Sequence, residues 1–193
     1  MKNVGILLFN EVEVMDFAGP FEVFSLSEDD DMNKLYKTFT VSQNDEVISA
    51  RNGFLAKAMC TFDTCPHIDI LIVPGGYGAE KIEIHNAVLL DWIAETSRNT
   101  KITASVCTGA FLLAKSRVLT SEKVTTHWMD QGDLQKRYPA LTVVSGEKFI
   151  DNGKILTSGG ISAGIVMSLH IVSKINGRAV AERTAKRMEY DWP

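Results

Sequence analysis

Cys107 stands between an apolar, strand-like run at residues 102–105 and a helix-like run that begins at Gly109. A glycine two positions after the cysteine lets the chain turn sharply from strand into helix. This pattern is typical of a nucleophile presented at the carboxyl edge of a sheet. Because a helix N-terminus stabilises a thiolate, it also predicts a Cys107 pKa below that of an ordinary thiol. The alternative is a buried, unreactive cysteine, which is the usual state of a free thiol.

A Pro-Gly-Gly turn at residues 74–76 follows a second apolar run at residues 71–73. Parallel strands end at the same edge of a sheet, so we expect this turn to lie near Cys107. The backbone N–H groups of Gly76 and Thr108 are then candidates for an oxyanion hole. A plain turn is the alternative. The segment lacks the spacing and the lysine of a phosphate-binding loop.

Two side chains are candidates for proton transfer. Asp16 comes a few residues after the first apolar run, so its carboxyl is expected at the same sheet edge as the thiol. Its alternative role is that of a helix N-cap. His127 follows a strand-like run at residues 123–126 and is a possible accessory group, although a lone histidine is more often structural.

The small residues 158–164 permit close packing beneath a pocket, or anion binding by backbone N–H groups.

These candidates need a sheet that brings strand ends together. Short apolar runs typical of buried parallel strands alternate with stretches of helical periodicity. The expected strands are residues 4–9, 39–42, 68–73 and 102–105, and the expected helices are 87–96, 163–175, 179–188 and one whose first turn contains Pro20. This alternation predicts an α/β fold with a mostly parallel sheet and helices on both faces.

Two hairpins are expected to interrupt the parallel pattern. Residues 47–49 and 54–58 flank Asn52-Gly53, and residues 149–150 and 155–157 flank Asp151-Asn152-Gly153. Because no repeat, low-complexity tract or linker is present, we expect residues 1–193 to form a single domain.

The composition excludes several classes of protein. A net charge of −4 argues against nucleic acid as the main partner. Three cysteines without a CxxC pair argue against a disulfide framework and a zinc site, and no metal or organic cofactor is indicated. No apolar stretch approaches the ~20 residues of a membrane helix, and the N-terminal apolar run is too short for a signal peptide. We therefore expect a cytoplasmic protein that acts on a small molecule and has no membrane partner.

Five segments, in order, resemble the ThiJ/PfpI superfamily over nearly the whole chain: residues 16–20, 74–76, 105–109, 126–128 and 159–164. The resemblance is closest to the branch that contains isonitrile hydratases and the amidotransferase-like domains of some AraC-type regulators. It implies a flavodoxin-like three-layer sandwich that is usually a homodimer. It also implies a nucleophile at Cys107, a carboxyl partner at Asp16, and oxyanion donors at Gly76 and Thr108.

Two departures from other branches narrow the expected activity. Relatives linked to peptidase-like activity carry histidine directly after the cysteine, where this chain has Thr108. Glutamine amidotransferases complete a triad with a downstream His-x-Glu, which this sequence lacks. AraC-type regulators also need a DNA-binding domain after this one, and with the sequence ending at Pro193 we expect none.

The residues and the resemblance together predict an isonitrile hydratase-like enzyme that adds water to a small isonitrile and releases an N-substituted formamide. Phe17, Tyr77 and Trp128 are expected to line its apolar pocket. One alternative is a glyoxalase or deglycase that acts on small 2-oxoaldehydes, with His127 moving the proton. A third hypothesis is a non-enzymatic redox sensor or regulatory domain that keeps an oxidisable Cys107.

Overall fold

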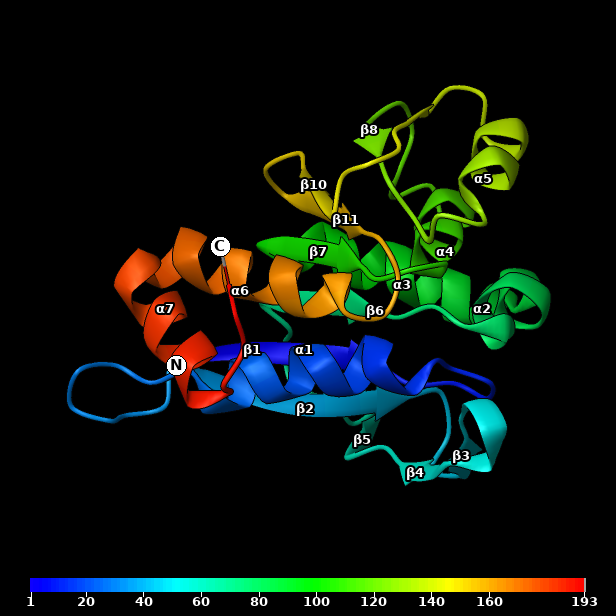
Figure 1. Cartoon of the computed structure of the whole chain (residues 1–193). Helices are drawn as coiled ribbons and strands as arrows, with labels where there is room; N and C mark the ends of the chain where they lie inside the picture. The colour runs from blue at the N-terminus through cyan, green and yellow to red at the C-terminus, as the bar shows by residue number, and fades with distance from the viewer. Residues whose placement is uncertain (193) are drawn as a thin grey trace.

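A seven-stranded sheet in the order β10-β11-β7-β6-β1-β2-β5 forms the centre of the computed structural model, which describes residues 1–192 (Figure 1). Its strands are β1 (Lys2–Leu7), β2 (Tyr36–Ser42), β5 (Cys60–Thr61), β6 (Ile70–Val73), β7 (Ile102–Ser105), β10 (Phe149–Asp151) and β11 (Ile155–Ser158). All neighbouring strands are parallel except β10 and β11. β6 and β7 are buried throughout, as strands covered on both faces must be.

Helices cover both faces of this sheet. The helices are α1 (Val14–Leu26), α2 (Tyr77–Lys81), α3 (Ala87–Asn99), α4 (Gly109–Lys115), α5 (Gln131–Arg137), α6 (Ala163–Asn176) and α7 (Arg178–Arg187), with short 3-10 turns η1 (Arg51–Gly53) and η2 (Glu83–His85). Figure 1 shows α1 and α6 in front of the sheet and α3 and α4 behind it. The predicted α/β sandwich is confirmed. Within residues 1–192, no helix is long and apolar enough to cross a membrane.

Both predicted hairpins are present. β3 (Val47–Ser49) and β4 (Leu55–Lys57) form a separate antiparallel pair. Asn52 and Gly53 between them have φ angles of 58° and 80°, the left-handed conformation that a tight hairpin turn requires. The second hairpin joins β10 to β11.

The strand predicted at residues 123–126 is shorter than expected. β8 (Lys123–Val124) pairs only with β9 (Thr142–Val143), in a small parallel sheet of its own. The next backbone N–H, that of Thr125, donates to the Thr157 hydroxyl at 2.9 Å, so the ladder ends there.

The first helix begins at Val14, well before the predicted start near Pro20. Pro20 therefore lies inside α1 and cannot donate a hydrogen bond to the carbonyl of Asp16, a loss that costs roughly 3 kcal/mol in a helix interior. Burial of Phe24 and other apolar side chains on the same helix offsets this cost. As a result, Asp16 lies in the first turn of a helix and not in a loop.

The central strands position the candidate site. β1, β6 and β7 are adjacent and parallel, so their carboxyl ends lie at one edge of the sheet. The chain leaves these strands toward α1, toward the Gly75-Gly76 turn and toward Cys107, respectively. Residues distant in sequence therefore meet at this edge.

Candidate active site

Cys107 occupies a strained turn between β7 and α4. Its φ angle is 55°, in the left-handed region that residues other than glycine seldom adopt. The turn is held on both sides, since the Cys107 N–H donates to the Gly159 carbonyl at 3.1 Å and the Thr126 hydroxyl donates to the Cys107 carbonyl at 2.7 Å. Only glycine fits at position 109, because a Cβ there would lie 2.1 Å from the carbonyl oxygen of Val73. These contacts make the predicted strand-to-helix turn a rigid one.

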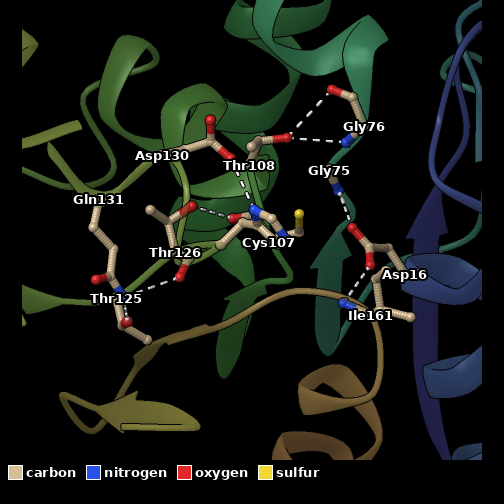
Figure 2. Close-up of polar contacts among 11 residues, drawn as sticks. Asp16, Gly75, Gly76, Cys107, Thr108, Thr125, Thr126, Asp130, Gln131 and Ile161 are labelled. Carbon is tan, nitrogen blue, oxygen red and sulfur yellow. Dashed lines mark hydrogen bonds and ion pairs between the residues drawn. The ribbon is translucent and has the colours of Figure 1, made fainter. Parts of the chain in front are cut away.

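The Asp16 carboxyl lies beside this turn and is completely buried. Its Oδ2 accepts a hydrogen bond from the Gly75 N–H at 3.1 Å, and its Oδ1 accepts one from the Ile161 N–H at 3.0 Å. The Cys107 thiol lies near enough to this carboxyl to lower the pKa of Asp16 slightly, against the larger effect of burial. Figure 2 shows the sulfur on the side of Cys107 that faces Gly75 and Asp16. Asp16 is therefore not a helix cap. It connects three segments of the chain to the thiol.

Burial dominates the electrostatics of this pair. It raises the pKa of Asp16 from 3.8 to about 7, against the lowering effect of the Gly75 and Ile161 N–H groups. Burial also raises the pKa of Cys107 above that of an ordinary thiol, and the nearby charge of Asp16 raises it further. Two negative charges side by side in a buried site are unfavourable, so the pair retains a proton.

The prediction that the Cys107 pKa lies below that of an ordinary thiol is therefore wrong. The N–H and hydroxyl of Thr108 do stabilise the thiolate. However, α4 has only seven residues, and its N-terminus does not outweigh the loss of solvent and the adjacent carboxylate. Burial also raises the pKa of the other two thiols, that of Cys60 to about 11.

The Gly76 N–H, expected to be a free oxyanion donor, is occupied. It donates to the Thr108 hydroxyl at 2.9 Å, and this hydroxyl donates to the Gly76 carbonyl at 3.2 Å (Figure 2). The reason is the close packing of the two turns, since a Cβ on Gly75 would lie 2.5 Å from the Thr108 nitrogen. Thr108 lies near the sulfur, and its N–H, ahead of its hydroxyl, lowers the pKa of Cys107 against the effect of burial. Thr108, and not Gly76, therefore supplies the donor near the thiol.

His127 lies near the thiol, and both contact Gly160. Its Nδ1 is 3.1 Å from Asp130 Oδ2, a contact that orients the ring. A Cβ built on Gly160 would lie 2.4 Å from His127 Cδ2 and 3.3 Å from Cys107 Sγ. Imidazole and thiol therefore both pack against Gly160, and this close fit requires that position 160 has no side chain.

The three residues predicted to line an apolar pocket lie in different environments. Phe17 is buried in the core. Tyr77 is 51% exposed, with the Arg51 guanidinium 5.7 Å above its ring. Trp128 is 74% exposed, next to His127 in the chain. Tyr77 and Trp128 thus contribute apolar surface at the protein exterior, whereas Phe17 packs within the fold.

Three groups at the site were not predicted from the sequence: the Gly75 N–H, the Ile161 N–H and the Asp130 carboxylate. The first two lie in glycine-rich segments that the sequence does mark, but the pattern does not reveal which N–H faces Asp16. Ile161 has a φ angle of 55°, unusual for a β-branched residue, and its N–H holds the carboxyl. The only sequence signal for Asp130 is its position three residues after His127.

Within residues 1–192, no group of three or more His, Cys, Asp or Glu side chains is arranged to hold a metal ion. The site therefore consists of a thiol, a buried carboxyl, a threonine and an oriented imidazole at a strand-to-helix turn. This set of groups can carry out nucleophilic addition coupled to proton transfer.

Comparison with known proteins agrees with this geometry. The DJ-1/PfpI family model matches residues 2–174. The chain belongs to the DJ-1/PfpI family. The resemblance drawn from the five sequence segments is thereby confirmed.

Members of the DJ-1/PfpI family similar to this chain include an enzyme and a regulator. The isonitrile hydratase of Pseudomonas putida is 29% identical over 187 residues, which span 97% of this chain and 78% of the hydratase. The HTH-type transcriptional regulator GbdR of Pseudomonas aeruginosa is 23% identical over 190 residues, but the match spans only 51% of that protein. Family membership alone therefore does not decide between catalysis and regulation.

Solved structures of the family share the fold. A ThiJ/PfpI family protein from Pseudomonas syringae superimposes with a TM-score of 0.88 at 24% identity, over 100% of this chain and 76% of that one. DJ-1beta of Drosophila melanogaster superimposes with a TM-score of 0.84 at 16% identity, over 99% of both chains.

Proposed function

We propose that this protein is an isonitrile hydratase-like enzyme in which Cys107 is the nucleophile and Asp16 the proton donor. The observation that carries the proposal is the buried Asp16 carboxyl beside the Cys107 thiol at the strand-to-helix turn, close enough for each group to shift the pKa of the other. Addition of a thiol to an isonitrile carbon requires one sulfur and one proton at the same place. The similarity to an isonitrile hydratase supports this choice of substrate class.

The reaction follows from the shared proton. The sulfur of Cys107 bonds to the terminal carbon of the isonitrile, and that carbon takes the proton held by the Cys107–Asp16 pair. The product is a thioimidate, in which the carbon–sulfur bond replaces the sulfur–hydrogen bond. Water then adds to the same carbon, with one of its protons accepted by Asp16 and the other transferred to the nitrogen as the carbonyl forms. Cleavage of the carbon–sulfur bond releases the N-substituted formamide and returns the proton to the thiol.

The remaining groups at the site stabilise the sulfur and fix the orientation of its neighbours. Thr108 stabilises the sulfur when it carries charge, chiefly through its N–H, because its hydroxyl donates to the Gly76 carbonyl. Gly76, whose N–H donates to the Thr108 hydroxyl, fixes the direction of that hydroxyl. His127 and the thiol both lie against Gly160, so a substrate carbon bonded to the sulfur would lie close to the imidazole.

A second candidate reaction is glyoxalase or deglycase chemistry on small 2-oxoaldehydes, which the pairing of His127 with Asp130 favours. The same thiol would add to the aldehyde carbon, and the imidazole would move a proton to or from the substrate.

A turnover screen of the purified protein on small alkyl isonitriles and on methylglyoxal tests both reactions. We expect formamide production from an isonitrile that depends on Cys107. Turnover of methylglyoxal alone would replace the first proposal with the second. No turnover of either would favour a regulatory or redox-sensing role. A homodimer in the cytoplasm stays a prediction from the sequence, and light scattering that shows only a 21.3 kDa species would contradict the dimer.

A further inference from the structure

Thr126 is buried beside the Cys107 turn and contacts its backbone. Only 1% of the residue is exposed, and its hydroxyl donates to the Cys107 carbonyl at 2.7 Å (Figure 2). The Ala110 N–H reaches the same carbonyl at 3.4 Å, so the hydroxyl is the closer of these two donors. The neighbouring hydroxyl of Thr125 is also buried but donates to the Val144 carbonyl at 3.0 Å. Thr126 is therefore the one of these two adjacent threonines that donates to the nucleophile.

The Cys107 carbonyl belongs to the same peptide group as the Thr108 N–H. This peptide bond is trans and planar, so the C=O and the N–H point in opposite directions. Thr108 is the N-cap residue of α4, and the helix does not use its N–H. That N–H instead lowers the pKa of Cys107, against the larger effect of burial. A donor that holds the Cys107 carbonyl therefore also fixes the direction of the N–H near the sulfur.

This peptide group lies in a strained turn that needs such a contact. Cys107 keeps a φ angle of 55°, which persists only where surrounding contacts hold the backbone in place. Hydrogen bonds that share a peptide group also polarise one another, so donation to the carbonyl strengthens the N–H on the other side as a donor. Thr126 is itself well held, because the preceding N–H, that of Thr125, donates to the Thr157 hydroxyl at 2.9 Å.

We propose that Thr126 is a positioning residue, which acts through the Cys107–Thr108 peptide group to align and polarise the N–H that stabilises negative charge on the sulfur. The proposal deepens the function proposed for Cys107 and rests on it for its catalytic meaning. The reactivity of the thiol toward an alkylating reagent can nevertheless be measured without any substrate. The two proposals can therefore fail separately.

The charged and titratable groups that face the thiol are held by other contacts. They are Asp16, His127 and Asp130. Backbone N–H groups hold the Asp16 carboxyl, and His127 Nδ1 lies 3.1 Å from Asp130 Oδ2. Loss of the Thr126 hydroxyl should therefore change the stabilisation of the thiolate without removing these charges.

Thr126→Val removes the hydroxyl and keeps the shape of the side chain. We expect the rate of Cys107 alkylation by iodoacetamide at pH 8 to fall about tenfold, because a hydrogen bond to a charged group is weakened. Thr126→Ser, which keeps the hydroxyl, should stay within about threefold of wild type. Thr125→Val is the matched control and should leave the rate unchanged. A merely structural role predicts the opposite sign, because a loosened turn would expose the buried thiol and speed its alkylation in Thr126→Val.

Turnover of an isonitrile supplies a second readout, in which kcat of Thr126→Val should fall about tenfold with little change in KM. Equal or faster alkylation in Thr126→Val, or failure of Thr126→Ser to restore the rate, would overturn the proposal. Slower alkylation in a protein whose wild type hydrates no isonitrile would instead remove the proposed function and keep the role of Thr126 toward the thiol. If Thr126→Val does not fold, heteronuclear NMR of the wild-type protein decides. A polarised Thr108 amide proton should resonate downfield of its random-coil position, and one at that position would overturn the proposal.

Discussion

The Cys107 thiol and the Asp16 carboxyl form one buried pair in which each group shifts the pKa of the other, although they come from opposite halves of the chain. Each oxygen of Asp16 also accepts one backbone N–H, from Gly75 and from Ile161. The carboxyl therefore has a fixed orientation beside the thiol, and burial favours its protonated form. The pair can deliver a nucleophile and a proton to one carbon atom, which is the requirement of the proposed reaction.

Replacement of Cys107 by alanine should abolish turnover, because no thioimidate can form without the sulfur. The fold should persist, since the backbone carries the strain of the turn and the change in volume is small. We expect the free energy of unfolding to change by about 1 kcal/mol. Cys60→Ala is the matched control and should retain turnover. Full activity in Cys107→Ala would rule out covalent catalysis at this residue.

Asp16→Asn should lower kcat/KM by about 10²- to 10⁴-fold, the usual contribution of an acid–base group, while iodoacetamide still alkylates Cys107. Asparagine places an NH₂ group against one of the two backbone N–H donors, so the variant should also lose about 1–3 kcal/mol of stability. Glu22→Gln, at an exposed carboxyl on the same helix, controls for the loss of charge. Steady-state rates and peptide mass spectrometry measure the two effects, and wild-type rates in Asp16→Asn would remove Asp16 from the mechanism.

The raised pKa of Asp16 predicts how stability depends on pH. The folded protein holds this proton up to about pH 7, whereas the ordinary value is 3.8. The contribution of Asp16 to stability is therefore fully present below about pH 4 and is lost as the pH rises through about 7. The free energy of unfolding of wild type relative to Asp16→Asn should fall over this interval, by up to about 1.4 kcal/mol per pH unit. Urea unfolding at pH 4.5, 6 and 7.5 measures this difference, and a flat profile would contradict the assigned pKa.

Gly160→Ala should reduce turnover by at least tenfold, because the added Cβ would lie 2.4 Å from His127 Cδ2 and 3.3 Å from Cys107 Sγ. Alkylation of Cys107 should slow as well. Gly159→Ala is a matched control one residue earlier, where the nearest atom to an added Cβ is at an ordinary 3.6 Å. Similar rates in the two variants would show that the space beside His127 is not used by the substrate.

The charges around Cys107 predict selectivity among thiol reagents. Asp16 and Asp130 both place negative charge near the sulfur. Neutral iodoacetamide should therefore alkylate Cys107 faster than anionic iodoacetate, and the ratio of the two rates should be larger in the folded protein than in urea. Added salt should reduce this ratio in the folded protein. Asp130→Asn should increase the relative rate of iodoacetate, whereas Asp133→Asn should not, because Asp133 is paired with Arg137 at 2.7 Å. Equal preference in the folded and unfolded chains would contradict an acidic site.

Features that depend on neighbours in the sequence were predicted well. The alternation of apolar runs and helical stretches predicted the α/β fold, and Asn52-Gly53 marked a hairpin. The sequence around Cys107 predicted a strand followed by a tight turn and a helix. The start of α1 was misplaced, because proline is favoured in the first turn of a helix and the packing that tolerates Pro20 in an interior is not visible locally.

The sequence by itself therefore determined the fold class, the turn at Cys107 and the expectation that Asp16 lies near it. Only the tertiary structure decided which N–H groups hold Asp16, that the Thr108 hydroxyl occupies the Gly76 N–H, and the direction in which the Cys107 pKa moves. The physical reason is that backbone conformation follows mainly from adjacent residues. Desolvation and charge proximity depend instead on segments that meet only when the sheet and its covering helices have packed.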